Sequence, residues 1–161
     1  MPSDAPSGPL NTFPAVRPFH PASDPAIFDQ IQRESPEAAQ WAPESYATLA
    51  GSGLGHILVS ATPTEVVGFL CARRVADEAE ILNLAVRPGF RRQGAGSQLV
   101  HEMIERLSGC RVKRVFLEVR ESNAGAIAFY QKHGFLRTGR RRSYYHDPVE
   151  DALVFQRLLT D

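Results

Sequence analysis

The sequence predicts one mixed α/β domain, with a central sheet and helices packed against it. Segments with the apolar pattern of strands are interleaved with segments in which apolar residues repeat at helical spacing. In addition, a strand, a glycine-containing loop and a helix follow one another directly over residues 81–107. With 161 residues, the chain is long enough to bury a core of its own.

The first half of the chain predicts a strand, two helices and three more strands. We expect the first strand at residues 13–17. A helix follows, with Asp24 as its cap and Pro25 in its first turn. Apolar residues then repeat at helical spacing, at Ile27, Phe28 and Ile31. The remaining elements expected in this half are a short helix at 43–49 and antiparallel strands at 56–61, 66–75 and 79–86.

The second half predicts two helices that alternate with strands. The helix after the glycine loop carries its apolar residues at Leu99, Met103, Ile104 and Leu107. In the next unit, Ser122 or Asn123 suits a helix N-cap, and Gly134 suits the position just past the C-terminus. The other elements expected in this half are a strand at 114–119, a helix at 123–133 and strands at 135–140 and 152–158.

The composition excludes several classes of protein. Residues 1–10 are rich in proline and lack the features of a signal peptide, so we expect a flexible extension there and one domain over 11–161. No apolar run reaches membrane-spanning length, so no membrane partner is expected. Cys71 and Cys110 are too few for a disulfide framework or a zinc site, and no metal is expected. A cytoplasmic location is the expectation.

The net charge of zero conceals an asymmetry between the two halves of the chain. Residues 1–86 hold 4 basic and 10 acidic side chains, a net charge of −6. Residues 87–161 hold 14 basic and 8 acidic side chains, a net charge of +6. The basic half suits a polyanionic ligand and the acidic half a basic peptide, although most of these charges are expected simply to face solvent.

The stretch from residue 85 to 99 has the properties of an anion-binding loop. Gly94 and Gly96 allow the backbone to approach a ligand, and the following helix directs free N–H groups at it. Arg91 and Arg92 add charge that suits phosphate oxygens. No Gly-Lys-Ser/Thr follows, and the G-x-G-x-x-G dinucleotide pattern is incomplete. The loop therefore predicts a ligand with a pyrophosphate group of another kind.

Four motifs in order resemble one known family. R-x-x-G-x-G from Arg91 to Gly96 resembles the coenzyme A pyrophosphate loop of the GCN5-related N-acetyltransferases, the GNAT superfamily. L-E-V-R-x-S-N-x-x-A-I-x-x-Y-x-x-x-G-F, over residues 117–135, resembles the last strand–helix unit of these enzymes. More narrowly it resembles RimI-type ribosomal-protein alanine N-acetyltransferases, as do residues 77–86 and 141–145. The resemblance covers about residues 15–160.

The resemblance implies the GNAT fold, a mixed and mostly antiparallel sheet flanked by helices, with splayed fourth and fifth strands. It also implies acetyl-CoA as cosubstrate. Asn123 is implied to contact the pantetheine arm, although a helix N-cap alone would also explain this residue. The residues implied to bind acetyl-CoA are Leu84, Ala85, Val86, Arg91, Arg92, Gln93, Gly94, Ala95, Gly96, Ser97, Asn123 and Tyr130.

Acetyl transfer to an amine needs a proton acceptor and a donor for the departing thiolate. The resemblance assigns the base to Glu118, with Glu80 as a rival, and the acid to Tyr130. From the residues alone, Glu118 could equally form a salt bridge with Arg73 or Arg120, and Tyr130 could simply pack on a helix face.

Three aromatic residues are the candidates for binding the acceptor. Tyr144 and Tyr145, in the loop expected before the last strand, resemble tyrosines that clamp a peptide N-terminus. Two hairpin aromatics packed on the sheet are the alternative. Trp41 resembles part of the region that borders the peptide groove, although Ala42-Pro43 interrupts the family pattern there.

The function predicted from the sequence is therefore transfer of an acetyl group from acetyl-CoA to an amine. The preferred acceptor is a protein N-terminus, of which a ribosomal protein is the example the resemblance suggests. The amine is expected to attack directly in a ternary complex. The alternatives are acetylation of a small amine or a lysine side chain, and a non-catalytic CoA-sensing module. No aromatic-interleaved basic surface indicates specific nucleic-acid binding.

Overall fold

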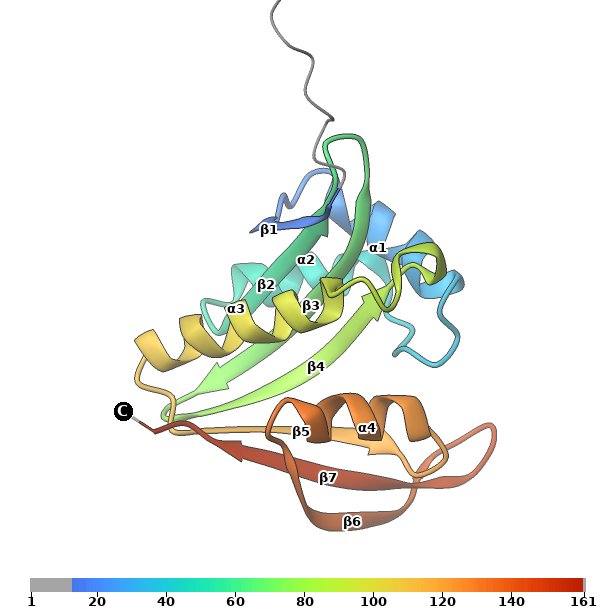
Figure 1. Ribbon diagram of the computed structural model, residues 1–161, viewed down its shortest axis with the longest axis vertical. Coiled ribbons are helices and arrows are strands. Elements are labelled where there is room, and N and C mark those ends of the chain that lie inside the picture. Colours follow the sequence, from blue (N-terminus) through green and yellow to red (C-terminus); the bar gives the residue numbers. More distant parts are fainter. Residues whose placement is uncertain (1–12, 161) are drawn as a thin grey trace, which may run out of the picture.

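Seven strands form one sheet in the order β1-β2-β3-β4-β5-β7-β6 in the computed structural model, which describes residues 13–160 (Figure 1). The extension expected at residues 1–10 lies outside the described residues. In chain order the elements are β1 (Ala15–Pro18), α1 (Asp24–Arg33), α2 (Pro43–Gly51), β2 (Gly55–Ala61), β3 (Val66–Val75), β4 (Glu78–Val86), a 3-10 turn (Pro88–Phe90), α3 (Ala95–Gly109), β5 (Arg114–Arg120), α4 (Ala124–Lys132), β6 (Leu136–Tyr145) and β7 (Glu150–Leu158).

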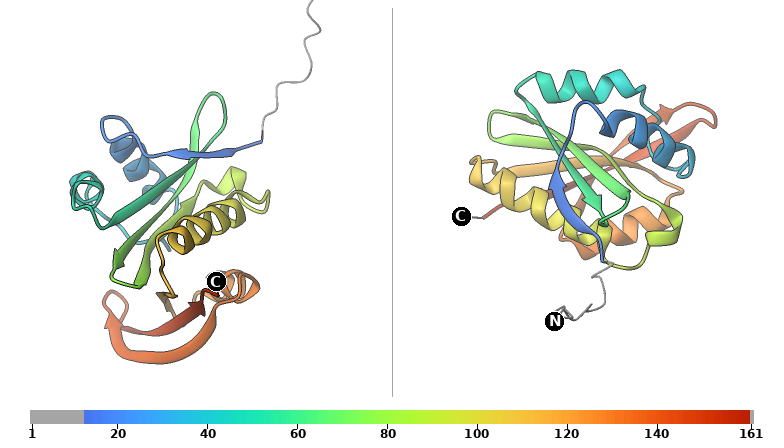
Figure 2. Two further views of the ribbon diagram at one scale, coloured as in Figure 1. Left: turned by 90° about the vertical axis from the view of Figure 1, so that its left-hand side faces the viewer. Right: turned by 90° about the horizontal axis from the view of Figure 1, so that it is seen from above.

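Two hydrophobic clusters hold the helices on opposite faces of the sheet. Helices α3 and α4 cover one face, and α1 and α2 cover the other face over the first four strands (Figure 2). Leu99, Met103 and Leu107 of α3 are fully buried on the first face. Phe28 of α1 stacks on Phe69 of β3 on the second, with ring centroids 4.0 Å apart. No helix of the described residues is long and apolar enough to cross a membrane.

A β-bulge in β4 reverses which face its side chains point to. In the ladder with β3, Cys71 faces Asn83 and Ala72 faces Ile81, which leaves Leu82 as the extra residue. Ile81 packs in the α3 cluster, whereas Leu82 packs against the α1/α2 cluster. The bulge thus brings Asn83 onto the α1/α2 side, where strict alternation with Ile81 would have kept it on the other face.

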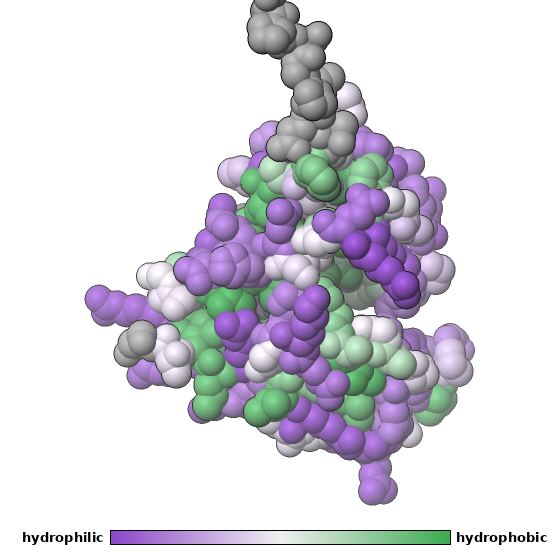
Figure 3. Space-filling model, viewed as in Figure 1, coloured by the Kyte–Doolittle hydropathy of each residue, from purple (hydrophilic) through white to green (hydrophobic). Residues whose placement is uncertain are grey.

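The fourth and fifth strands form a fork. They pair in parallel over only three residue pairs, from Glu78 with Arg114 to Glu80 with Phe116. Beyond this point β4 and β5 diverge, and a notch separates the two halves of the molecule at that end (Figures 1 and 3). The sheet is antiparallel everywhere else, so the splayed strands predicted from the resemblance are present.

Two of the local predictions were wrong. Asp24 is not the N-cap of α1; Ser23 holds that position, and the Asp24 carboxylate instead accepts hydrogen bonds from Arg17 and the His20 N–H. The predicted loop around Tyr144 and Tyr145 is the end of β6, which runs five residues further than expected, to Tyr145. The sequence of this segment resembles that of a loop because β6 is an edge strand, and most of its side chains are exposed.

Candidate active site

The glycine loop between β4 and α3 leaves several backbone donors free. Gly94 has a φ of +88°, a conformation that favours glycine, and it caps α3. The N–H groups of Ala95, Gly96 and Ser97 make no hydrogen bond within the described part of the chain. An added Cβ at Gly96 would lie 3.4 Å from the Phe129 ring, so the glycine lets α3 approach α4 closely. These free donors at a helix N-terminus suit an anionic group.

Arg91 lies in this loop, but its guanidinium already has protein partners. Its Nε donates to the Val86 carbonyl at 2.9 Å. Its Nη2 donates to Ser35 Oγ at 2.9 Å and to Glu37 Oε1 at 2.6 Å, both in the segment between α1 and α2. Arg91 therefore joins the end of β4 and the glycine loop to residues 34–42, which we call the acceptor loop.

The other loop and helix residues predicted to bind the donor differ in whether their side chains already have partners within the protein. Gln93 donates its side-chain amide to the Gly89 carbonyl at 3.3 Å, within the loop. The hydroxyl of Ser97 lies 3.0 Å from Nε2 of His133, and this contact joins α3 to the end of α4. Arg92 makes no ion pair within residues 13–160, and its charge is available to an anion. Asn123 caps α4, since its side-chain oxygen accepts from the Ala126 N–H at 3.1 Å.

The fork provides an unpaired strand edge beside this loop. Beyond Glu80 the edge of β4 that faces β5 has no partner strand, and Leu84, Ala85 and Val86 lie on it. Their side chains pack into the two cores, so the backbone is what these residues can offer a ligand. Unpaired backbone groups of a strand suit the amides of an extended ligand.

Glu118 lies on the face of β5 that no helix covers, here called the open face. Its side chain is 10% exposed and forms an ion pair with Arg141, whose Nε lies 2.5 Å from Oε1 of Glu118. A hydrogen bond to Glu118, followed by burial, raises the pKa of Tyr144. The salt bridge that the sequence left open is therefore present. Its partner is Arg141 of β6, and neither Arg73 nor Arg120 fills that role.

Glu80 is the second carboxylate of the open face. Burial and then the charge of Glu118 raise its pKa, while Arg73 and Arg141 oppose the rise. Arg73 is its ion-pair partner at 3.5 Å. Glu80 is therefore better suited to hold a proton than an isolated glutamate would be, and it borders the point at which the two strands separate.

Tyr130 lies on the opposite side of β5, within the core beneath α4. It is 9% exposed, and its hydroxyl makes no hydrogen bond with residues 13–160. Burial raises its pKa, so the hydroxyl keeps its proton at neutral pH. Glu118 and Tyr130 therefore lie on opposite faces of the sheet.

The tyrosines predicted to clamp the acceptor stand beside Glu118. The rings of Tyr144 and Tyr145 meet edge to face, with centroids 5.1 Å apart. The guanidinium of Arg120 lies 4.2 Å from the centroid of the Tyr145 ring. Burial raises the pKa of Tyr145 to about 12. The β6–β7 turn and the acceptor loop both lie at the open end of the fork (Figures 1 and 2).

A buried polar network, which the sequence did not reveal, fixes the acceptor loop. Asn83 is 5% exposed; its amide group donates to the Ala39 carbonyl at 2.9 Å and to the Tyr46 hydroxyl at 3.0 Å. That hydroxyl also bonds to Gln32, whose amide donates to the Trp41 carbonyl at 2.9 Å. Trp41 stacks on Tyr46 with centroids 5.2 Å apart. The only local signal was a polar Asn83 inside an apolar strand.

Two features lie outside this arrangement. Cys71 is fully buried, and burial raises the pKa of its thiol to about 12, so it is a poor nucleophile at neutral pH.

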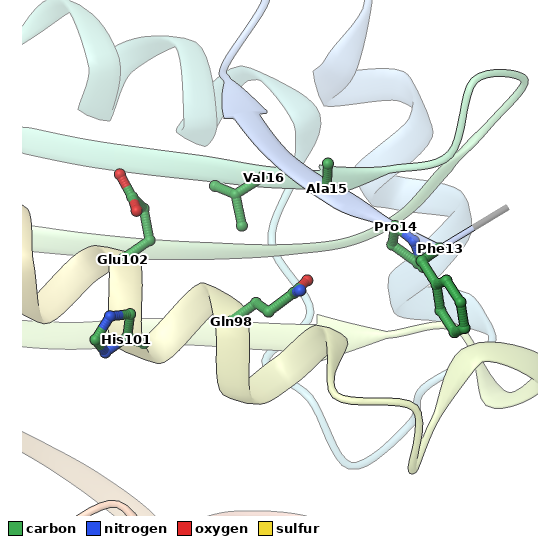
Figure 4. Close-up of a pocket in the computed structure, with 7 residues that line it drawn as sticks. All are labelled: Phe13, Pro14, Ala15, Val16, Gln98, His101 and Glu102. Atoms are coloured by element: carbon green, nitrogen blue, oxygen red, sulfur yellow. The ribbon is translucent and has the colours of Figure 1, made fainter. Parts of the chain in front are cut away.

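A cavity of about 470 Å³ lies between β1 and the outer side of α3, and Gln98 and Glu102 extend into it (Figure 4). None of the predicted site residues lines this cavity. Residues 13–160 contain no cluster of His, Cys, Asp and Glu that could hold a metal.

The arrangement fits the donor that the sequence predicts. Free N–H groups and Arg92 suit a diphosphate, and the unpaired edge of β4 suits an amide-containing arm. Within the described residues, no strand pairs with this edge of β4 beyond Glu80.

Comparison with known proteins agrees with the family that the sequence resembles. Residues 23–135 match the acetyltransferase (GNAT) family. The chain is 35% identical over 132 residues to ribosomal protein bS18-alanine N-acetyltransferase of Escherichia coli strain K12, which covers 81% of this chain and 87% of that protein.

Solved structures agree as well. The crystal structure of ribosomal-protein-S18-alanine N-acetyltransferase from Escherichia coli has a TM-score of 0.81 at 29% identity, and the match covers 92% of this chain and 95% of that one. Ard1 from Thermoplasma volcanium has a TM-score of 0.81 at 28% identity, covering 92% and 99%. The fold class predicted from the sequence is confirmed.

Proposed function

The chain belongs to the GNAT acetyltransferase family, and from this premise we propose that it acetylates the N-terminal α-amine of a protein. Acetyl-CoA is the acetyl donor. The finer proposal is that the acceptor is a ribosomal protein with an N-terminal alanine, by similarity to the relative from Escherichia coli, and that the reaction takes place in the cytoplasm.

The observation that carries the proposal is the Glu118 carboxylate, which is 10% exposed on the open face of β5 and pairs with the exposed guanidinium of Arg141. A carboxylate with so little exposure favours a cationic partner, and an α-ammonium group can take the place that the guanidinium of Arg141 fills. The acceptor loop and the β6–β7 turn lie at the open end of the fork (Figure 1). This arrangement supports an extended peptide that enters with its N-terminus first.

We propose the following roles for the site residues. Glu118 takes the proton from the α-ammonium, and Tyr130 donates a hydrogen bond to the departing sulfur. The free N–H groups of Ala95, Gly96 and Ser97 hold the diphosphate, and the edge of β4 at Leu84, Ala85 and Val86 holds the pantetheine amides. Because the thiol of Cys71 stays protonated, the amine attacks the thioester directly.

The energetics favour an α-amine as acceptor. Deprotonating an α-amine of pKa ~7.8 at pH 7 costs about 1 kcal/mol, whereas a lysine of pKa ~10.4 costs about 4.6 kcal/mol. An N-terminal acceptor therefore needs only a modest base.

The test is release of CoA from acetyl-CoA with two peptide sets. One set has a free N-terminal alanine, serine or methionine, and the other has a blocked N-terminus and one internal lysine. We expect turnover only with free N-termini, and highest with alanine. Turnover on lysine alone, or on small amines alone, would overturn the proposal. Binding of acetyl-CoA without turnover on any amine would favour a sensing module.

Variants assign the base and the acid. We expect Glu118→Gln to lower kcat by about 100-fold or more and Tyr130→Phe by about tenfold or more, while Glu80→Gln costs clearly less than Glu118→Gln. A larger loss in Glu80→Gln than in Glu118→Gln would transfer the role of base to Glu80. Thermal unfolding of each variant controls for loss of fold.

A further inference from the structure

Arg141 covers the carboxylate that the acceptor must reach. Its Nε lies 2.5 Å from Oε1 of Glu118. The Arg141 side chain is 58% exposed, whereas that of Glu118 is 10% exposed. Its guanidinium carbon is 5.8 Å from the centroid of the Tyr144 ring. The carboxylate is held within the sheet, so the exposed guanidinium is the partner that can move.

The charges around Glu118 leave little room for another cation. Two carboxylates, Glu118 and Glu80, meet two guanidinium groups there, those of Arg141 and Arg73. Tyr144 and Tyr145 complete the surroundings on β6, and Arg120 already lies over Tyr145 and pairs with Glu150. An ammonium group that entered with Arg141 still in place would give three cations beside two anions. Exchange of the ammonium for Arg141 would keep the balance.

We propose that Arg141 is a gating residue that occupies Glu118 until the α-ammonium of the acceptor takes its place. The guanidinium and the ammonium carry the same charge and both donate to a carboxylate, so each can replace the other. This inference rests on the proposed role of Glu118 as the base. Its consequence is that the base becomes available only when an acceptor is present.

The gate matters because water could otherwise attack the bound thioester. In that reaction the water oxygen bonds to the acetyl carbon and the carbon–sulfur bond breaks. One proton of the water goes to Glu118 and from there to the departing thiolate, and the acetic acid that forms releases its remaining proton to solvent, giving acetate and CoA. A guanidinium on Oε1 of Glu118 opposes this proton transfer, so it protects the donor while no acceptor is bound.

The test compares Arg141→Met with Arg142→Met. Arg142 is the next residue, is exposed, and makes no ion pair or hydrogen bond within residues 13–160, so its variant controls for loss of one positive charge. We measure CoA release from acetyl-CoA without any acceptor. We expect an increase of at least fivefold in Arg141→Met, a smaller one in Arg141→Lys, and none in Arg142→Met. Adding Glu118→Gln to Arg141→Met should abolish the increase.

Peptide kinetics separate the gate from a binding role. The gate predicts a lower KM for the acceptor in Arg141→Met, because the ammonium no longer competes with the guanidinium. A severalfold higher KM without faster hydrolysis would mean that Arg141 binds the acceptor, and it would overturn the proposal. Hydrolysis equal to that of the unchanged protein and of Arg142→Met would also overturn it. The acceptor-free assay needs no peptide, so it decides the matter even if the acceptor is a lysine or a small amine.

Discussion

Asp24 is a fully buried carboxylate at the first turn of α1, and its partners tie that helix to β1. Arg17 donates to both carboxylate oxygens at 2.9 Å, and the His20 N–H donates to Oδ2 at 2.7 Å. Burial alone would raise the pKa of Asp24, but the hydrogen bonds from Arg17 and His20 and the charge of Arg17 outweigh it and lower the pKa. The ionised carboxylate therefore stabilises the fold.

We expect Asp24→Asn to lower the free energy of unfolding by about 2 kcal/mol at pH 7, the worth of hydrogen bonds to a charged group. A carboxylate with a lowered folded-state pKa stabilises above its unfolded pKa, and this contribution disappears as pH falls through the folded-state pKa. The loss should therefore shrink below about pH 4. Urea unfolding at several pH values measures it. Asp29→Asn, which removes a surface ion pair with Arg33, is the control. If the loss of unfolding free energy in Asp24→Asn were the same at every pH, the prediction would be contradicted.

The carboxylates show how far single residues could be predicted. The family resemblance singled out Glu118 and Glu80, and for Glu118 the sequence added a second reason, because a carboxylate among apolar neighbours is costly unless it is paired or used. The partner of Glu118 could not be found in the same way. Arg141 reaches it through the order β5-β7-β6 and an irregular register between β6 and β7, and neither follows from local spacing.

At the scale of elements, apolar runs located the strands and helices, while the irregularities went unrecognised. Residues 78–81 alternate between polar and apolar, and Leu82, a second apolar residue directly after Ile81, breaks this alternation where the bulge lies. The bulge decides that Asn83 meets the acceptor loop, so a local irregularity determines a contact with residues 44 positions earlier. The length of β6 was missed because its arginines and tyrosines resemble a polar turn.

The acceptor loop is also joined to the donor side by ion pairs between segments of opposite charge. Arg91 pairs with Glu37 at 2.6 Å, and Arg87 approaches Glu34 at 3.8 Å. The acidic first half of the chain thus meets the basic second half at the glycine loop. Anchoring of the acceptor loop therefore depends on the same segment that is proposed to hold the diphosphate.

We expect Glu37→Gln to raise the KM for the acceptor peptide by about two- to fivefold, the scale of an exposed ion pair, with kcat little changed. The reason is that the acceptor loop loses one anchor while Glu118 and Tyr130 are untouched. Steady-state kinetics with a free N-terminal peptide measures the effect. Glu102→Gln removes an ion pair of similar exposure on α3 and should leave KM unchanged. A changed kcat with an unchanged KM in Glu37→Gln would contradict the prediction. Equal effects on KM in Glu37→Gln and Glu102→Gln would contradict it too.

At the scale of the whole molecule, the two halves are joined by few contacts near the site. The parallel pairing of β4 with β5 ends at Glu80. On the helix side, α3 meets α4 where Gly96 approaches Phe129 and where Ser97 contacts His133. A ligand that binds across the fork would therefore add contacts between β4 and β5 where the two strands are not paired.

Binding of acetyl-CoA should protect both sides of the fork at once. We expect slower hydrogen exchange in residues 81–86 of β4 and in 117–120 of β5. At a concentration 100 times Kd, the free energy of unfolding should rise by about 2.7 kcal/mol. For a domain of this size, each kcal/mol raises Tm by about 2–4 °C.

A fragment of CoA that lacks the pantetheine arm is the matched control. It would contact the glycine loop and α3 only, so it should slow exchange at the N-terminus of α3 and leave β5 unchanged. Equal protection of β5 by this fragment would mean that the fork does not hold the arm.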